Sequence, residues 1–217
     1  QAKTLFPYTT LFRSSIGVAF TGTNRSVNIA GTLRTSTTGT GTVNFTNSLA
    51  TVSGTLDLSS TTNAATSNAT NLTIGATGTV ICGSNSVVIP TATWNAASNL
   101  NITGAVGATS ATGAAQNFGN VTYNCAGSTA TMSFFTSGTV TIQNLTVTNT
   151  NTGRFRALTS GTLTVGNITL NGGTLEIAST TGTANVSGNV TVNGGLLDIT
   201  SGTGAATLKI AGTYNQT

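Results

Sequence analysis

The stretch GNITLNGGTLEI, residues 166–177, recurs 22 residues later as GNVTVNGGLLDI, residues 188–199. In both copies apolar residues alternate with Thr or Asn, and an Asn-Gly-Gly sequence interrupts the pattern. Alternation with a period of two predicts half-buried strands, and Asn-Gly-Gly predicts a tight turn. Each copy is therefore expected to form short strands joined by a turn.

The same period runs through most of the chain. Two shorter elements repeat at steps of 22 to 24 residues: Asn-apolar-Thr-apolar at Asn120, Asn144, Asn167 and Asn189, and Gly-Thr-apolar at Gly31, Gly54 and Gly78. A unit of this size holds two or three strands of three to five residues. Alone it cannot bury its apolar face, so neighbouring units must stack.

We therefore predict an all-β fold, a parallel β-solenoid (β-helix) in which each repeat forms one coil. Stacking at the usual inter-strand spacing of about 4.8 Å gives about nine coils. The alternative is a set of antiparallel β-sandwich repeats, because Gly and Asn also fill hairpin turns. The steady repeat favours the solenoid. Residues 15–217 are expected to form a single domain, with an irregular coil and a protruding loop around 82–125.

The first residues are interpreted separately, because TLFPYTTLFRS, residues 4–14, resembles the in-frame translation of a common short-read sequencing adapter. Every residue of that stretch matches. We interpret residues 1–14 as a non-native, adapter-derived segment and exclude them from the fold prediction. The native part is then expected to begin near Ser15 and to be truncated at both ends.

Charge is scarce in this chain: 5% of residues are charged, against roughly 25% in an average globular protein. The formal net charge of +4 falls to about +2 without Lys3 and Arg13, which lie in the adapter-like segment. The basic residues are scattered rather than clustered, which argues against nucleic-acid binding. There is also no apolar run of about 18 residues, so no membrane insertion is expected.

The chain lacks the residues for most catalysis. It contains no His, which excludes His-dependent triads and imidazole metal sites. Glu176 and Asp198 occupy equivalent repeat positions and would lie about 5 Å apart on adjacent coils, a separation similar to that of a retaining glycosidase. The favoured interpretation is an outward-facing acidic position duplicated with the repeat, with a bridging cation as a minor alternative. We predict a non-enzyme without cofactor or metal.

Cys82 and Cys125 are the only cysteines and are 43 residues apart, near two repeat periods. Two coils separate equivalent positions by roughly 9 to 10 Å, too far for a disulfide unless an irregular middle segment closes the gap. A disulfide in an oxidising compartment and two buried free thiols both remain open.

Two Thr-x-Thr pairs, Thr139 with Thr141 and Thr146 with Thr148, fit the outward Thr rows of ice-binding solenoids. They are not expected to repeat in each later coil, and Thr is in any case a favourable strand residue. Asn167 and Asn189 are expected to be turn-stacking residues rather than ligands.

Three stretches, residues 93–95 (TWN), 100–104 (LNITG) and 116–125 (QNFGNVTYNC), together with the coils that follow, resemble long repetitive secreted proteins of Bacteroidetes. The resemblance covers about residues 85–217. It implies export by type IX secretion and a place outside the cell or on its surface. The expected function is a non-catalytic structural or adhesive segment, a stalk or adhesin repeat, with surface glycans or other cell-surface proteins as partners. A carbohydrate-acting or ice-binding solenoid module is the alternative.

Overall fold

The computed structural model describes residues 3–5, 11–14, 18–19, 25–35, 42–46, 48–59, 65–67 and 70–217. In these ranges every regular element is a β-strand and every strand pairing is parallel. The predicted parallel β-solenoid is thereby confirmed, with about eight turns against the nine expected. None of these ranges contains a helix able to cross a membrane.

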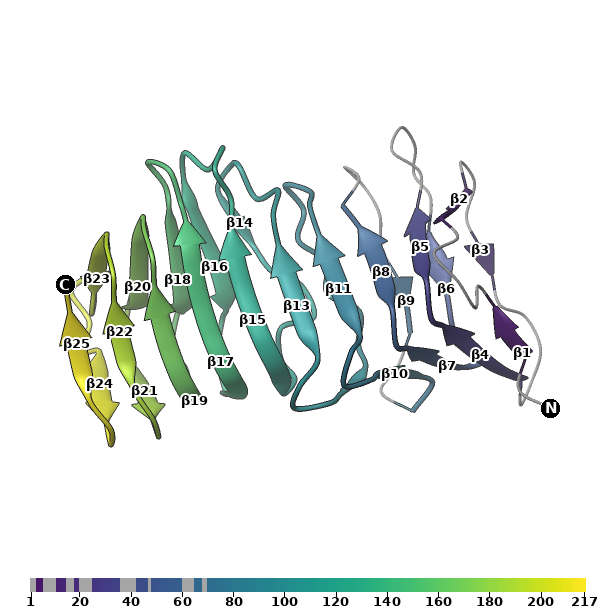
Figure 1. Cartoon of the computed structure of the whole chain (residues 1–217). Helices are drawn as coiled ribbons and strands as arrows, with labels where there is room; N and C mark the ends of the chain where they lie inside the picture. Colours follow the sequence, from purple (N-terminus) through teal and green to yellow (C-terminus); the bar gives the residue numbers. More distant parts are fainter. Residues whose placement is uncertain are drawn as a thin grey trace.

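Each coil contributes to three faces, which follow one another along the chain, and β1 and β25 lie at opposite ends of the stack (Figure 1). Face 1 comprises β1 (Lys3–Leu5), β4 (Arg25–Ile29), β7 (Ser48–Val52), β10 (Leu72–Ile74), β12 (Thr93–Trp94), β21 (Gly182–Val186) and β24 (Thr207–Ile210). Face 2 comprises β2 (Leu11–Ser14), β5 (Thr32–Thr35), β8 (Thr55–Leu58), β11 (Thr79–Cys82), β13 (Asn99–Ile102), β22 (Val190–Val192) and β25 (Tyr214–Gln216).

Three longer strands continue from face 1 into face 2: β15 (Phe118–Asn124), β17 (Thr139–Asn149) and β19 (Gly161–Leu170). Face 3 comprises β3 (Val18–Ala19), β6 (Val43–Asn44), β9 (Ala65–Thr66), β14 (Thr109–Ser110), β16 (Thr131–Phe135), β18 (Arg154–Leu158), β20 (Thr174–Ala178) and β23 (Leu196–Asp198). The chain therefore winds in one direction, and each strand pairs with its equivalent in the next coil.

The register confirms the repeat but widens its range. Paired residues are separated by as few as 20 positions, from Thr79 to Asn99, and by as many as 25, from Val18 to Val43. Strands keep their inward and outward positions aligned because a one-residue slip would turn every side chain to the other side. Variation in repeat length is thus confined to the turns between faces.

The long strands turn a corner where the alternation of buried and exposed residues breaks. In β17, Gln143 and Asn144 are both exposed between the buried Ile142 and Leu145. The equivalent corner in β19 carries Gly166, where an added Cβ would overlap the carbonyl oxygen of Gln143 in the coil below. Glycine is required there by the close approach of two backbones.

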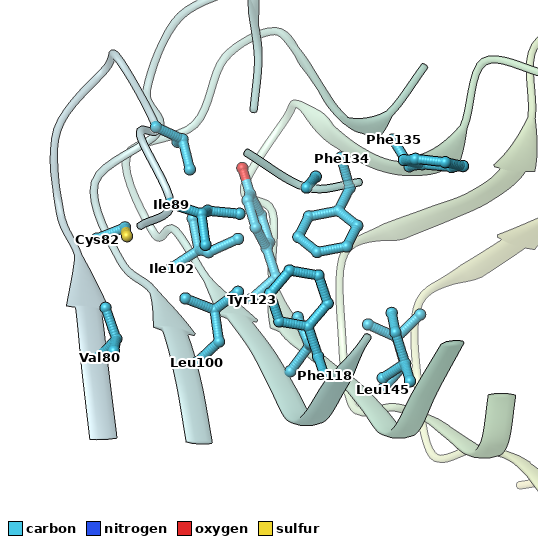
Figure 2. Packing of buried hydrophobic residues seen from close by; sticks show 14 of the residues in the cluster. Val80, Cys82, Ile89, Leu100, Ile102, Phe118, Tyr123, Phe134, Phe135 and Leu145 are labelled. Carbon is cyan, nitrogen blue, oxygen red and sulfur yellow. The ribbon is translucent and has the colours of Figure 1, made fainter. Parts of the chain in front are cut away.

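The interior is one hydrophobic cluster that extends from Val27 to Val192. Inward side chains of successive coils stack on one another, and Figure 2 shows the aromatic rings gathered in the middle coils. Ring centroids lie 5.1 Å apart for Trp94 and Phe118, 5.6 Å for Phe118 and Phe134, and 5.7 Å for Phe134 and Phe155. These offset and edge contacts add to the burial of the rings themselves.

In residues 82–125, for which an irregular coil is expected, face 3 is reduced to the bridge between Val88 and Thr112 and the two-residue strand β14. The side chain of Gln116 takes over there. Its Oε1 accepts hydrogen bonds from the Trp94 indole at 3.1 Å and from the backbone of Ala92 at 3.0 Å. Its Nε2 donates to two backbone carbonyls, so a side chain satisfies the groups that a regular ladder would have paired.

Part of the adapter-like segment 1–14 is included in the stack. Lys3–Leu5 pairs with β4 and Leu11–Ser14 pairs with β5, while residues 1–2 and 6–10 lie outside the described residues. Strand pairing joins backbone groups, which every sequence supplies. The non-native origin of this segment therefore stays a prediction.

Candidate functional site

The paired acidic position lies on face 3. Arg156 of β18, Glu176 of β20 and Asp198 of β23 are register partners in consecutive coils. The repeat thus brings Glu176 and Asp198 together as the sequence predicts, and it adds a basic residue to the same row.

Glu176 is enclosed rather than outward facing. Its Oε2 pairs with Arg156 Nε at 2.9 Å and with Arg154 Nη1 at 3.3 Å. Its Oε1 accepts hydrogen bonds from the Ser201 hydroxyl at 2.6 Å and the Ser201 backbone at 3.2 Å. The side chain has 0% exposure, so the expected solvent-facing position is wrong for Glu176. The two arginines and Ser201 cover it.

The protonation of Glu176 follows from these contacts. Burial by itself raises the pKa of its carboxyl, because the charged form loses hydration. The hydrogen bonds from Ser201 and Arg156 and the charge of Arg156 outweigh burial, and the pKa lies below its usual value. Glu176 is therefore a carboxylate near neutral pH, with both oxygens engaged.

Asp198 is the more accessible partner, with 24% exposure, and its Oδ2 lies 3.7 Å from Arg154 Nη1. A retaining glycosidase needs one acid whose pKa is raised and one carboxylate with a free oxygen. Glu176 provides neither. A cation between the two carboxylates would meet the positive charges of Arg154 and Arg156. Among the described residues, no group of three or more His, Cys, Asp or Glu side chains could hold a metal.

The remaining carboxylate is also paired. Asp57 of β8 is 2% exposed and lies 2.6 Å from Arg34 of β5, its register partner in the coil before. Its other oxygen accepts a hydrogen bond from the backbone of Ser59 at 3.0 Å. All three acidic side chains of the chain therefore form ion pairs with an arginine from another coil.

Cys82 and Cys125 are both buried free thiols. The register from β11 through β13 to β15 places Cys82 level with Tyr123, two coils on, and Cys125 lies two residues further along. Each sulfur instead faces a backbone carbonyl oxygen at 3.5 Å. Burial, followed by the charge of Asp57, raises the pKa of Cys82 to about 12, and burial also raises that of Cys125. Neither thiol is ionised near neutral pH, which makes both unreactive.

The Thr pattern is more regular than the sequence interpretation allowed. Thr139 and Thr141 are register partners of Thr162 and Thr164, so the Thr-x-Thr pair does repeat in the next coil. Further along face 1, one row continues as Thr183 and Thr207 while the other changes to Asn185 and Lys209. The repetition is visible in the sequence at a spacing of 23 residues, which is one repeat.

An asparagine ladder runs along the corner between faces 1 and 2. The Asn120, Asn144 and Asn167 amides each donate to the preceding asparagine, at 3.2, 2.8 and 2.9 Å, starting from Asn99. The Asn189 backbone continues the ladder by donating to Asn167 Oδ1 at 2.9 Å. The stacking role expected for Asn167 and Asn189 is confirmed.

No family model, curated protein or solved structure matches this chain. Its function is therefore inferred from the geometry described above.

Proposed function

We propose that this chain is a non-catalytic structural segment, a stalk or adhesin repeat, of a secreted or cell-surface protein. The observation that carries the proposal is the pairing of all three acidic side chains with arginines of other coils. Charged groups in an enzyme are directed at a substrate, whereas these connect one coil to another. They act as part of the stack.

The shape supports a spacer. About eight turns at a coil spacing of about 4.8 Å make a rod roughly 40 Å long. Its first and last described strands lie at opposite ends (Figure 1), so further repeats would lengthen it without changing its cross-section. The placement outside the cell, and surface glycans or other surface proteins as partners, rest on the resemblance of residues 85–217 to repetitive secreted proteins.

The carbohydrate-acting alternative depends on Glu176 and Asp198, and the chemistry of Glu176 argues against it. A carboxylate that is fully buried, held by two arginines and lowered in pKa does not donate a proton to a leaving group near neutral pH. We therefore favour the structural role over glycoside hydrolysis.

The test is a hydrolysis assay on the full chain with a panel of neutral and acidic polysaccharides, read as new reducing ends. We expect no release above buffer. The isosteric variant Glu176→Gln is the matched control, because a contaminating hydrolase would act equally in both preparations. Hydrolysis by the wild type that disappears in Glu176→Gln would overturn the proposal.

A further inference from the structure

The C-terminal part of face 2, from β13 to β25, presents two rows of outward side chains, which we call the Thr/Asn face. One row is Asn99, Asn120, Asn144 and Asn167, and the other is Asn101, Thr122, Thr146, Thr169, Thr191 and Asn215. All of them are half-buried or exposed, and the residues between them point into the core. Six consecutive coils thus display the same two side-chain types.

This face carries no charged side chain. The charged residues of the same coils lie elsewhere: Arg154, Arg156, Glu176 and Asp198 are on face 3, and Lys209 is on face 1. The Thr rows of face 1 end at Lys209, whereas the rows of face 2 continue to the last strand. A ligand of the Thr/Asn face is therefore expected to be neutral and polar.

The side chains on this face are held in place. The asparagines are linked amide to amide along the ladder, for example Asn167 to Asn144 at 2.9 Å. The threonines are β-branched and have few side-chain conformations in a strand. Within the described chain, the hydroxyls of Thr122, Thr146, Thr169 and Thr191 have no hydrogen-bond partner. They form a row of fixed hydroxyls available to an external ligand.

The dimensions favour a periodic ligand over a protein. Rows repeat at about 4.8 Å along the stack and at about 6.7 Å along each strand. The whole face covers roughly 300 Å² at these spacings, well below the about 800 Å² that each partner of a stable protein complex buries. A flat sheet also offers no pocket for a small molecule. A crystalline surface with a similar repeat can contact every coil at once.

We propose that the Thr/Asn face adsorbs to ice. A plane of ice is neutral, donates and accepts hydrogen bonds, and repeats at distances comparable to those of the rows. Thr offers a hydroxyl to that lattice and a methyl group to the spaces within it. A crystalline polysaccharide is less suited, because sugar rings bind on exposed aromatic side chains and none belongs to the two rows. Many weak contacts on one rigid body act together, so adsorption persists although each contact is weak.

The test measures ice recrystallisation with the full chain and two variants in the same strand. Thr169→Lys places a long charged side chain in the centre of the Thr/Asn face. Thr164→Lys makes the same change five residues earlier on face 1, where Thr164 is exposed. We expect the wild type and Thr164→Lys to stop recrystallisation at similar concentrations, and Thr169→Lys to require at least about tenfold more protein. Circular dichroism checks that each variant is folded.

Thr146→Lys, one coil earlier in the same row, replaces Thr169→Lys if that variant does not fold. A folded wild type without effect on ice would overturn the proposal, whether or not it adsorbs to cellulose or chitin powder. An equal loss in Thr164→Lys and Thr169→Lys would also overturn it, because the activity would then not belong to this face. The stalk role is independent of both results.

Discussion

Arg156 donates from its Nε to Oε2 of Glu176 at 2.9 Å, and the two residues are also backbone register partners in adjacent coils. The ion pair and the strand pairing therefore act between the same two coils. Their coincidence ties the stability of face 3 to a single charge pair, which leads to the first two predictions.

Replacement of Arg156 by Met should destabilise the chain. Glu176 would keep Arg154 and Ser201 as partners, but a fully buried carboxylate would lose its shortest charged contact. We expect a loss of about 1.5–3 kcal/mol, the range for a hydrogen bond to a charged group. Urea unfolding followed by circular dichroism measures it. Lys209→Met, at an exposed position, should stay within about 0.5 kcal/mol of wild type, and an equal effect of both changes would contradict the prediction.

The lowered pKa of Glu176 predicts a pH dependence of defined sign. Because the pKa is lower in the folded chain than in the unfolded chain, this residue contributes stability above its unfolded pKa of about 4.3. That contribution is lost as the pH falls through the folded pKa. The urea midpoint of wild type should therefore fall more steeply between pH 6 and pH 3 than that of Glu176→Gln. Parallel curves for the two proteins would show that Glu176 is not stabilised as a carboxylate.

Gly166 should tolerate no side chain. Its missing Cβ leaves room for the carbonyl oxygen of Gln143, so Gly166→Ala forces the backbones of two coils apart and should cost about 1–3 kcal/mol, as overpacking does. The matched control is Gly107→Ala, where the nearest atoms to an added Cβ are 3.6 Å away, in the Asn85 side chain. Thermal unfolding of both variants tests the difference, and a melting temperature equal to wild type in Gly166→Ala would count against this corner geometry.

The last coil should make the 217-residue chain self-associate. Its inward residues Leu208 and Ile210 are half-buried, whereas their register partners Ala184 and Val186 are buried. Leu196 is 57% exposed, and the outer backbone edge of this coil is open to pairing. Sedimentation should show assembly that increases with concentration and decreases in Leu208→Lys. A monodisperse wild-type monomer at high concentration would contradict this.

The sequence predicted the architecture because its evidence is local. Alternating apolar residues, Asn-Gly-Gly turns and a steady step each appear within one repeat, and together they specify a coil. The irregular coil lengths could not be predicted, because they depend on how turns such as that around Gln116 satisfy backbone groups. That side chain reaches carbonyls from Pro90 to Gly113, which no short window of sequence reveals.

The candidate site was predicted only in part. The repeat placed Glu176 next to Asp198, but the burial of Glu176 depends on Arg154 and Arg156, about one repeat before it, and on Ser201, 25 residues after it. Alignment of these residues at the repeat period would have revealed the arginines. The contact with Ser201 would have been missed, because it follows from the path of the turn after β23.

The central claim is that successive repeats stack in parallel with equivalent residues in register. The most direct measurement is disulfide formation in the double variant Thr146→Cys/Thr169→Cys, whose positions are register partners in adjacent coils. Their Cα atoms should lie about 5 Å apart, within the range that a disulfide spans. We predict nearly complete cross-linking under mild oxidation in this variant and none in Thr146→Cys/Thr164→Cys. Cross-linking of the second pair, or its absence in the first, would contradict the solenoid register.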